Sequence, residues 1–300
     1  MPMWLLYALS GCLYAAVYRV AGYRIGVVRE NLRRAFPDKT ERQRKDIERS
    51  FYRWLCDYFV ETVKLAGMGR EEMRRRMAFE GVGAVNGEIA KGRSVAVYLG
   101  HYGQWEWITS LPLWTGEGCT CAEVYHPLEN PAADKMFKDV RQRFGSVCVP
   151  VNETLRAMAA MQRRGEKMVM GFIADQAPFW NNIHHWVDFL HQDTPVLTGA
   201  EKIVGRMGMA TFYGDVRRTG RGRYVCRFVP MEGGGGEFPL TDTYFRMLEE
   251  SIRRDPAMYL WTHKRWKRTR EEYDIRLDKA TGRVDLRDLG EIKREKGLER

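Results

Sequence analysis

Cysteine is sparse in this 300-residue chain and does not form the pairs that disulfide or metal sites need. Six cysteines are present, and none stands in the C-x-x-C spacing of redox and zinc motifs. Cys119 and Cys121 would point the same way on a strand, but two thiols do not make a metal site. The sequence therefore excludes a small secreted disulfide scaffold and favours a reducing cytoplasm.

A long hydrophobic run is also missing. Residues 3–17 are uncharged, but about 20 apolar residues are needed to span a bilayer. Positive charge follows this stretch, at Arg19, Arg24 and Arg29, whereas a signal peptide carries its charge in front. We therefore expect residues 1–27 to form an amphipathic helix that lies on or partly in a membrane, with its basic flank on the cytoplasmic side. The alternative is an amphipathic helix packed on the protein's own core.

The chain has no phosphate-binding loop. Residues 233–236 are four consecutive glycines, yet no strand leads into them and no Lys-Ser or Lys-Thr pair follows. Such a run is typical of a flexible linker, and it precedes a predicted helix at residues 241–254.

Basic residues outnumber acidic ones, which gives the chain a net charge of +10. This charge predicts an acidic partner: nucleic acid, anionic lipid, a phosphorylated substrate or an acidic protein. The 9 tryptophans and 14 tyrosines favour a membrane interface, where amphipathic rings lie among lipid headgroups. No nucleic-acid-binding motif accompanies the charge, so we expect no nucleic-acid partner.

Strand-like and helical patterns alternate through the middle of the chain. The alternation predicts an α/β layered domain with a mainly parallel, mixed central sheet flanked by helices. The last two strands are joined across residues 219–222 and read as a hairpin, which adds an antiparallel part. Asp38 and Glu41 predict the start of a long helix that continues to about Leu65. The expected strands are residues 94–99, 120–125, 147–151, 167–173, 210–216 and 224–230, and the expected helices are residues 105–113, 132–144, 153–164 and 197–207.

We expect one large domain at residues 28–268, between the N-terminal helix and a C-terminal extension. A hydrophobic content of 44% over 300 residues is enough to bury one full core. Residues 269–300 are charged and almost free of large apolar side chains, which predicts a mobile tail.

The most informative residues for function are His101 and Glu106. A hydrophobic run that ends at Gly100 is typical of a buried strand before a tight turn, and the residues after Gly103 read as helix. Glu106 then falls in the first helical turn, where its carboxylate can reach back to the loop. A histidine held by a carboxylate is a general base that activates a hydroxyl without a Ser or Cys nucleophile. The alternative is a turn histidine near a glutamate with no catalytic role.

The segment His101-Tyr-Gly-Gln-Trp-Glu106 resembles the His-four-residues-Glu motif of the bacterial lipid A biosynthesis acyltransferases, which belong to the lysophospholipid acyltransferase superfamily. Residues 27–37, 125–131, 175–176 and 261–267 resemble further blocks of that family, in the same order. The resemblance covers residues 28–267 and implies the α/β fold of glycerolipid acyltransferases. Such relatives usually begin with a longer hydrophobic leader, so the resemblance also implies that this chain starts within that leader.

The resemblance implies an acyltransferase that moves a fatty acyl chain from acyl carrier protein to a hydroxyl of a lipid A precursor. Its partners would be acyl carrier protein, this glycolipid and the cytoplasmic face of the bacterial inner membrane, and no metal or redox cofactor is implied. Glu106 stands where phospholipid-type relatives usually carry Asp, which favours the lipid A branch. The alternatives are acyl transfer to another membrane lipid, such as an amino-acid lipid or a glycosylated phospholipid, and a non-catalytic basic protein that binds membrane or nucleic acid.

The same resemblance suggests roles for individual residues. His101 would act as the base and Glu106 would orient it, and we expect the backbone N–H groups of Gly103 and Gln104 to face the oxyanion. His126 stands where relatives usually carry an Arg that would stabilise the oxyanion or hold a phosphate. The alternatives are a turn or capping role for the polar residues and solvated surface charge for the basic ones. The other expected substrate contacts are Asp175, Gln176 and Arg218, and the expected membrane or phosphate contacts are Arg29, Arg33, Arg265 and Lys267.

Overall fold

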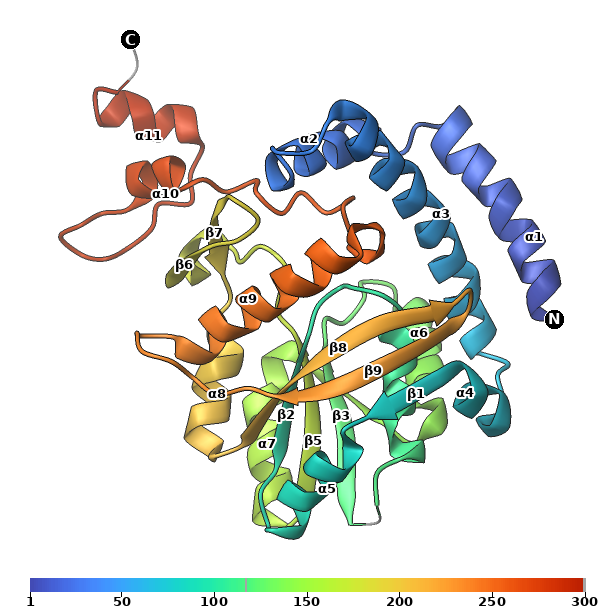
Figure 1. The fold of residues 1–300 in the computed structure, drawn as a ribbon. Coiled ribbons are helices and arrows are strands. Elements are labelled where there is room, and N and C mark those ends of the chain that lie inside the picture. Colours follow the sequence, from blue (N-terminus) through green and yellow to red (C-terminus); the bar gives the residue numbers. More distant parts are fainter. Residues whose placement is uncertain (117, 299–300) are drawn as a thin grey trace.

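The computed structural model describes residues 1–116 and 118–298, and its centre is a seven-stranded mixed sheet (Figure 1). The strand order is β1-β9-β8-β2-β5-β3-β4, and every neighbouring pair is parallel except β8 and β9. The predicted α/β architecture with a mainly parallel sheet is confirmed, as is the antiparallel hairpin. The strands are β1 (Met77–Glu80), β2 (Val95–Leu99), β3 (Cys119–Tyr125), β4 (Val147–Pro150), β5 (Lys167–Ile173), β8 (Ala210–Gly220) and β9 (Arg223–Pro230).

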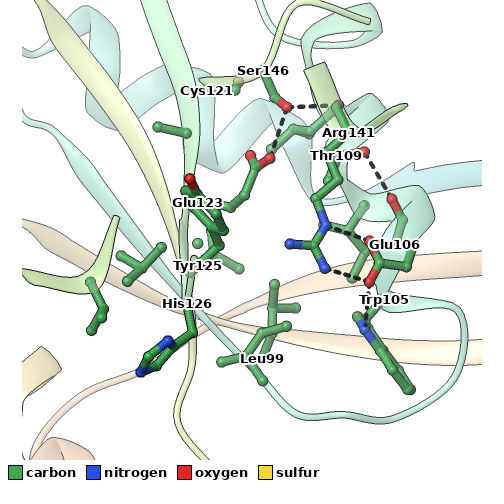
Figure 2. A pocket seen from close by; sticks show the side chains of 18 of the residues that line it. Leu99, Trp105, Glu106, Thr109, Cys121, Glu123, Tyr125, His126, Arg141 and Ser146 are labelled. Atoms are coloured by element: carbon green, nitrogen blue, oxygen red, sulfur yellow. Dashed lines mark hydrogen bonds and ion pairs between the residues drawn. The ribbon is translucent and has the colours of Figure 1, made fainter. Parts of the chain in front are cut away.

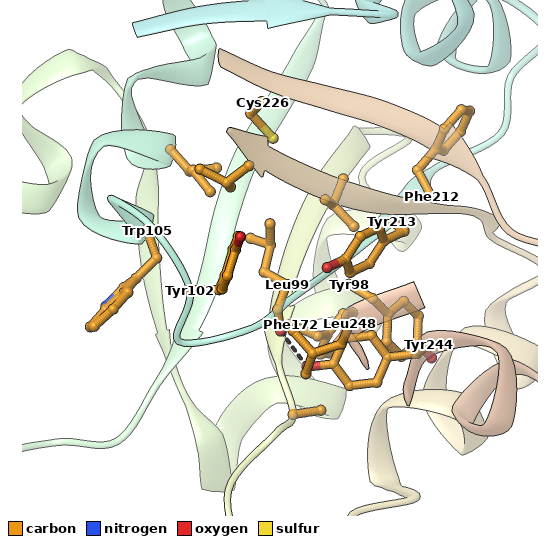
Figure 3. Packing of buried hydrophobic residues seen from close by; sticks show 14 of the residues in the cluster. Tyr98, Leu99, Tyr102, Trp105, Phe172, Phe212, Tyr213, Cys226, Tyr244 and Leu248 are labelled. Carbon is orange, nitrogen blue, oxygen red and sulfur yellow. Dashed lines mark hydrogen bonds between the residues drawn. The ribbon is translucent and has the colours of Figure 1, made fainter. Parts of the chain in front are cut away.

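Helices cover both faces of the sheet. On one face α9 packs through Tyr244, whose ring centroid lies 5.5 Å from that of Tyr98 in β2 (Figure 3). Side chains alternate along a strand, so Val97 and Leu99 point to the other face, which α6 and the 3₁₀-helix η2 cover. The helices are α1 (Met3–Tyr14), α2 (Ile25–Ala35), α3 (Glu41–Leu65), α4 (Arg70–Arg76), α5 (Val82–Ala90), η2 (Trp105–Leu113), α6 (Pro131–Arg141), α7 (Thr154–Arg163), α8 (Gly199–Met207), α9 (Pro239–Arg254), α10 (Arg270–Arg276) and α11 (Leu289–Glu295).

Several elements were not expected from the sequence. They are the strand β1, the helices α2, α4 and α5, and a second sheet of β6 (His185–Asp188) and β7 (Asp193–Val196). The turn between β6 and β7 places Leu190 and His191 at φ 53° and 61°. Hairpin turns with two positive φ angles favour Asn and Gly, so the sequence carries no signal for this hairpin.

The N-cap of the long helix α3 is Thr40 instead of the predicted Asp38. The Thr40 N–H donates to Oε1 of Gln43 at 2.8 Å, and the Gln43 N–H donates to Oγ1 of Thr40 at 3.3 Å. This capping box satisfies two N–H groups at the helix start, and it fixes the boundary two residues later than the Asp38 and Glu41 pair suggested.

The N-terminal helix lies along α3 (Figure 1). The Tyr7 hydroxyl donates to Oε1 of Glu61 at 2.9 Å, and the Ser10 hydroxyl donates to Oδ1 of Asp57 at 2.6 Å. The helical segment Met3–Val20 has the length and composition of a membrane span, which corrects the estimate from the uncharged run alone. Only a small part of it is buried, and Trp4 is 71% exposed. The segment therefore packs on the protein through Met3, Leu6 and the polar contacts of Tyr7 and Ser10, and it leaves apolar side chains open on its other side.

The region predicted as a mobile tail carries two short helices, α10 and α11, up to Leu298. The Tyr273 hydroxyl donates to the Ile183 carbonyl at 3.3 Å, and the ring of Tyr273 packs edge-on against Trp186 of β6. Ile292 of α11 is buried. The few apolar side chains of this segment are thus enough to give it local structure beside the β6–β7 sheet.

Candidate active site

His101 and Asp175 meet at the carboxyl ends of two neighbouring parallel strands. His101 follows β2 and Asp175 follows β5, which pair directly in the sheet. The Nδ1 atom of His101 lies 2.6 Å from Oδ1 of Asp175, and the His101 backbone N–H donates to Oδ2 at 3.1 Å. Because the carboxylate accepts from Nδ1–H, the imidazole presents Nε2 as a proton acceptor.

The electrostatics of this pair favour the charged form of both groups. Burial lowers the pKa of His101, but the charge and the hydrogen bond of Asp175 outweigh burial and leave the pKa raised. Burial raises the pKa of Asp175, and the interaction with His101 outweighs that effect and leaves the pKa lowered. Asp175 can therefore stabilise an imidazolium that forms when His101 takes a proton.

Glu106 does not orient His101 in this structure, which corrects the prediction from their spacing. The Glu106 carboxylate accepts Nε and Nη2 of Arg141, both at 2.7 Å (Figure 2). It also accepts the indole N–H of Trp105 at 3.2 Å. Arg141 reaches it from α6, a long-range contact that a local sequence pattern does not reveal. Glu106 still acts on His101 at a distance, since its charge contributes to the raised pKa of the imidazole.

Of the two backbone N–H groups expected to face an oxyanion, that of Gly103 is used differently, and the role of the Gln104 N–H stays a prediction. The Gly103 N–H donates to the Met258 carbonyl at 3.0 Å, so it is not free for a substrate. Gly103 has φ 65°, and a Cβ there would lie 2.6 Å from Cγ1 of Val216, so this position requires glycine for the turn itself. The Gln104 side chain is fully buried and donates to Oε2 of Glu61 at 3.0 Å. Both residues shape the turn that carries His101.

A cavity of ≈ 420 Å³ extends from His101 along the strands. Its size is that of a small-molecule pocket. His126 and Gln176 line it at the carboxyl ends of the strands, as predicted for substrate contacts, and the amide Nε2 of Gln176 lies 3.3 Å from Nε2 of His101. Its deeper lining is mostly apolar and comes from β2, β3, β5, β9 and η2, including Val97, Leu111, Cys121, Val169 and Phe228.

The predicted basic contacts fall in three different environments. Arg218 does not line the cavity, and its guanidinium lies 3.6 Å from the Asp255 carboxylate. Arg29 forms an ion pair with Glu48 at 2.8 Å, and Arg33 forms one with Glu30 at 2.8 Å. Lys267 is exposed, in line with a surface contact. These positions leave the proposed lipid or phosphate contacts as predictions.

Arg265 does not make the membrane or phosphate contact that was predicted for it, because only 1% of its surface is exposed. Its Nη2 donates to the Pro195 carbonyl at 2.8 Å, and the guanidinium faces the ring of Phe245 at 5.7 Å. Burial lowers the pKa of Arg265, and its charge helps to lower the pKa of Asp175. The aromatic residues around it fold this segment inward, so Arg265 supports the site from behind instead of contacting a membrane.

Two residues of the cavity wall were not recognised from the sequence. Arg141 is one, and Glu123 of β3 is the other. Glu123 accepts Oγ of Ser146 at 3.3 Å and Sγ of Cys148 at 3.1 Å, and burial raises its pKa to about 7. The sequence did carry a signal for Glu123, because Cys121, Glu123 and Tyr125 alternate and therefore lie on one face of the strand. A carboxylate on an inward face is unusual and could have marked this position as part of a site.

Fold and site together define an α/β protein with a carboxylate-supported histidine beside a largely apolar cavity. The chain matches the sequence profile of the family described as bacterial lipid A biosynthesis acyltransferase over residues 1–268, and it belongs to that family. It is similar to the lipid A biosynthesis acyltransferase of Haemophilus influenzae, with 23% identity over 173 residues, 58% of this chain and 53% of the relative. It is also similar to the lipid A biosynthesis myristoyltransferase of Escherichia coli K12, with 24% identity over 137 residues, 45% of this chain and 41% of the relative. The matched region spans about half the length of these curated relatives.

Proposed function

We propose that this protein transfers a fatty acyl chain from the thioester of acyl carrier protein to a hydroxyl of a lipid A precursor. The observation that carries the proposal is the position of His101 in the wall of the largely apolar cavity, with Asp175 on Nδ1 and with Nε2 beside the amide of Gln176, which lines the same cavity. An acyl chain in the cavity would bring its thioester carbonyl to this nitrogen. The printed names of the relatives agree with a lipid A precursor as the acceptor.

In the proposed reaction, Nε2 of His101 takes the proton of the acceptor hydroxyl as the oxygen attacks the thioester carbonyl carbon. A C–O bond forms, the carbonyl becomes an oxyanion, and its collapse breaks the C–S bond. The proton then passes from the imidazolium to the departing thiolate, which restores neutral His101. Asp175 stabilises the imidazolium between these steps, and general-base assistance of this kind contributes roughly 10²- to 10⁴-fold.

Arg141 is our proposed donor to the oxyanion. Glu106 engages Nε and Nη2, whereas Nη1 makes no hydrogen bond with any residue in the described part of the chain. Arg141 and His101 both line the cavity, and Figure 2 shows Arg141 against Glu106. A guanidinium that is fixed in this way stabilises a developing negative charge without reorganisation. This role would fall to Arg141 because position 126 carries His.

We propose that the protein works at the cytoplasmic face of the bacterial inner membrane. Trp4, Leu9 and Val20 expose apolar surface along the N-terminal helix. Arg19 and Arg24 stand beside them and match the charge of anionic headgroups. Helix and charge together would hold the cavity close to a lipid acceptor.

The experiment is to incubate isotopically labelled acyl carrier protein thioester with bacterial membrane extract and the purified full chain, and to identify labelled lipids by mass spectrometry. The proposal predicts one labelled lipid A precursor with wild type and its loss with Asp175→Ala and Arg141→Ala. Label in an amino-acid lipid or a phospholipid would identify a different acceptor. No labelled lipid with wild type would contradict acyl transfer.

A further inference from the structure

Glu123 places a carboxyl group in the wall of an otherwise apolar part of the cavity. Its hydrogen bonds from Ser146 and Cys148 both reach Oε1. The second oxygen, Oε2, makes no hydrogen bond with any residue that the structure describes. Glu123 is half-buried and lines the cavity, so its free oxygen is available to a ligand there that supplies a hydrogen-bond partner.

The presence of Glu123 in the cavity wall is not explained by an ion pair with Arg141. Arg141 is already paired with Glu106, which it contacts through two hydrogen bonds of 2.7 Å. No hydrogen bond joins Arg141 and Glu123 in the described part of the chain, although their charges interact. Glu123 is instead held through Oε1 by Ser146 and Cys148, and it lines the cavity close to Ser146 (Figure 2).

The sheet register gives the depth of Glu123 in the cavity. Glu123 and Val97 pair with Gly171 from opposite sides, and His101 lies four residues beyond Val97. β2 continues for two residues beyond Val97, so at ~3.3 Å per residue the backbone of Glu123 lies roughly 7 Å below the end of the strand from which His101 follows. Gly171 has no side chain, and a Cβ there would touch Cβ of Glu123 and Cδ1 of Leu99, both at 3.8 Å, so glycine leaves more room between these two side chains.

We propose that Glu123 makes this cavity select an acyl chain that carries a hydroxyl group part-way along its length, with the hydroxyl bound at Oε2. The inference rests on the proposed acyl transfer and names its donor class more closely. A hydroxyl can donate to the carboxylate or accept from the protonated acid, so it fits Glu123 in either form. The raised pKa of Glu123, about 7, means that both forms are populated near neutral pH. A site built to bind a substrate hydroxyl discriminates strongly against the analogue that lacks it.

The test measures kcat/KM with acyl carrier protein thioesters of one chain length, either unsubstituted or with the hydroxyl at successive carbons. We expect wild type to prefer one hydroxylated donor by at least about tenfold. Glu123→Leu should lose this preference and still transfer the unsubstituted chain, and Glu123→Gln should keep part of it. Cys121→Val is the matched control, because it changes the same wall of the cavity and leaves Glu123, Ser146 and Cys148 in place. It should keep the wild-type ratio of kcat/KM between the hydroxylated and the unsubstituted donor.

Equal or better use of the unsubstituted chain by wild type at every hydroxyl position would overturn the inference. So would an unchanged preference in Glu123→Leu. Absence of transfer with all donors would instead count against the proposed function. In that case the binding of hydroxylated and plain free fatty acids to the full chain is measured by calorimetry. Tighter binding of a hydroxylated acid would support the role of Glu123, and equal affinity would refute it.

Discussion

The carboxylate of Asp175 lies 2.6 Å from Nδ1 of His101, although the two residues are 74 positions apart in the chain. Their contact follows from the sheet, because β2 and β5 are parallel neighbours and both end at the same edge. Asp175 also accepts the backbone N–H of His101 at 3.1 Å, which fixes the turn as well as the ring. The base and its support are therefore both held at one edge of the central sheet.

Asp175→Asn should lower kcat by about 10³- to 10⁴-fold with little change in KM, because an amide cannot stabilise the imidazolium and can hold the wrong tautomer. Steady-state kinetics with an acyl carrier protein thioester measure both constants. Asp188→Asn, at an exposed position of β6, is the control and should behave as wild type. A loss confined to KM would show that Asp175 serves substrate binding instead.

The pH dependence of kcat/KM should report the raised pKa of His101. The base must be neutral to accept a proton, so activity should fall as pH decreases through a midpoint above 6.5, the ordinary value for histidine. Replacing Asp175 by Asn removes the charge that raises this pKa, so the residual activity of the variant should fall at a lower pH than that of wild type. An acidic limb with the same midpoint in both proteins would mean that another group controls it.

Removal of Arg141 should destabilise the fold as well as stop the reaction. Only 6% of the Glu106 side chain is exposed, so Arg141→Ala leaves a buried carboxylate without its partner. We expect the free energy of unfolding to fall by about 3 kcal/mol. This is the lower end of the range for broken buried ion pairs, because the Arg141 side chain is itself 23% exposed. Urea unfolding followed by circular dichroism measures this. The double variant Glu106→Gln/Arg141→Ala should recover part of the loss, and no recovery would contradict the pairing.

The hydroxyl of Tyr7 should contribute to stability although it lies on the N-terminal helix. Glu61 is fully buried and accepts Tyr7 at 2.9 Å, Gln104 at 3.0 Å and Tyr224 at 3.0 Å. Tyr7→Phe should therefore lower the free energy of unfolding by about 1–3 kcal/mol, measured in detergent. Tyr23→Phe is the matched control, because the Tyr23 side chain is 49% exposed and its hydroxyl makes no hydrogen bond in the described residues. Equal stability of both variants would mean that the helix does not depend on this contact.

Periodicity in the sequence was sufficient for the architecture but not for the contacts of the site. The strand β5 has its predicted bounds, because a short apolar run between turn residues is an unambiguous pattern. The hairpin β6–β7 was hidden by Leu190 and His191 in a turn that usually needs Gly or Asn. Such failures arise where a tertiary contact overrides a local preference.

The site shows the same division between local pattern and tertiary contact. His101 and Asp175 were both recognised from motifs, but sequence distance paired His101 with Glu106, whereas the sheet pairs it with Asp175. Arg141 and Glu123 carried no motif, and only the cavity brings them together with His101. Pairings that cross the sheet need its register, which no single segment contains.

The central claim is that His101 acts as the general base in acyl transfer. The most direct test is a single-turnover measurement with purified full chain, one acyl carrier protein thioester and one lipid A precursor, with the acylated product quantified by mass spectrometry. We predict that His101→Ala forms product roughly 10²- to 10⁴-fold more slowly than wild type. His101→Ala that keeps the wild-type rate while transferring the acyl chain would contradict the account.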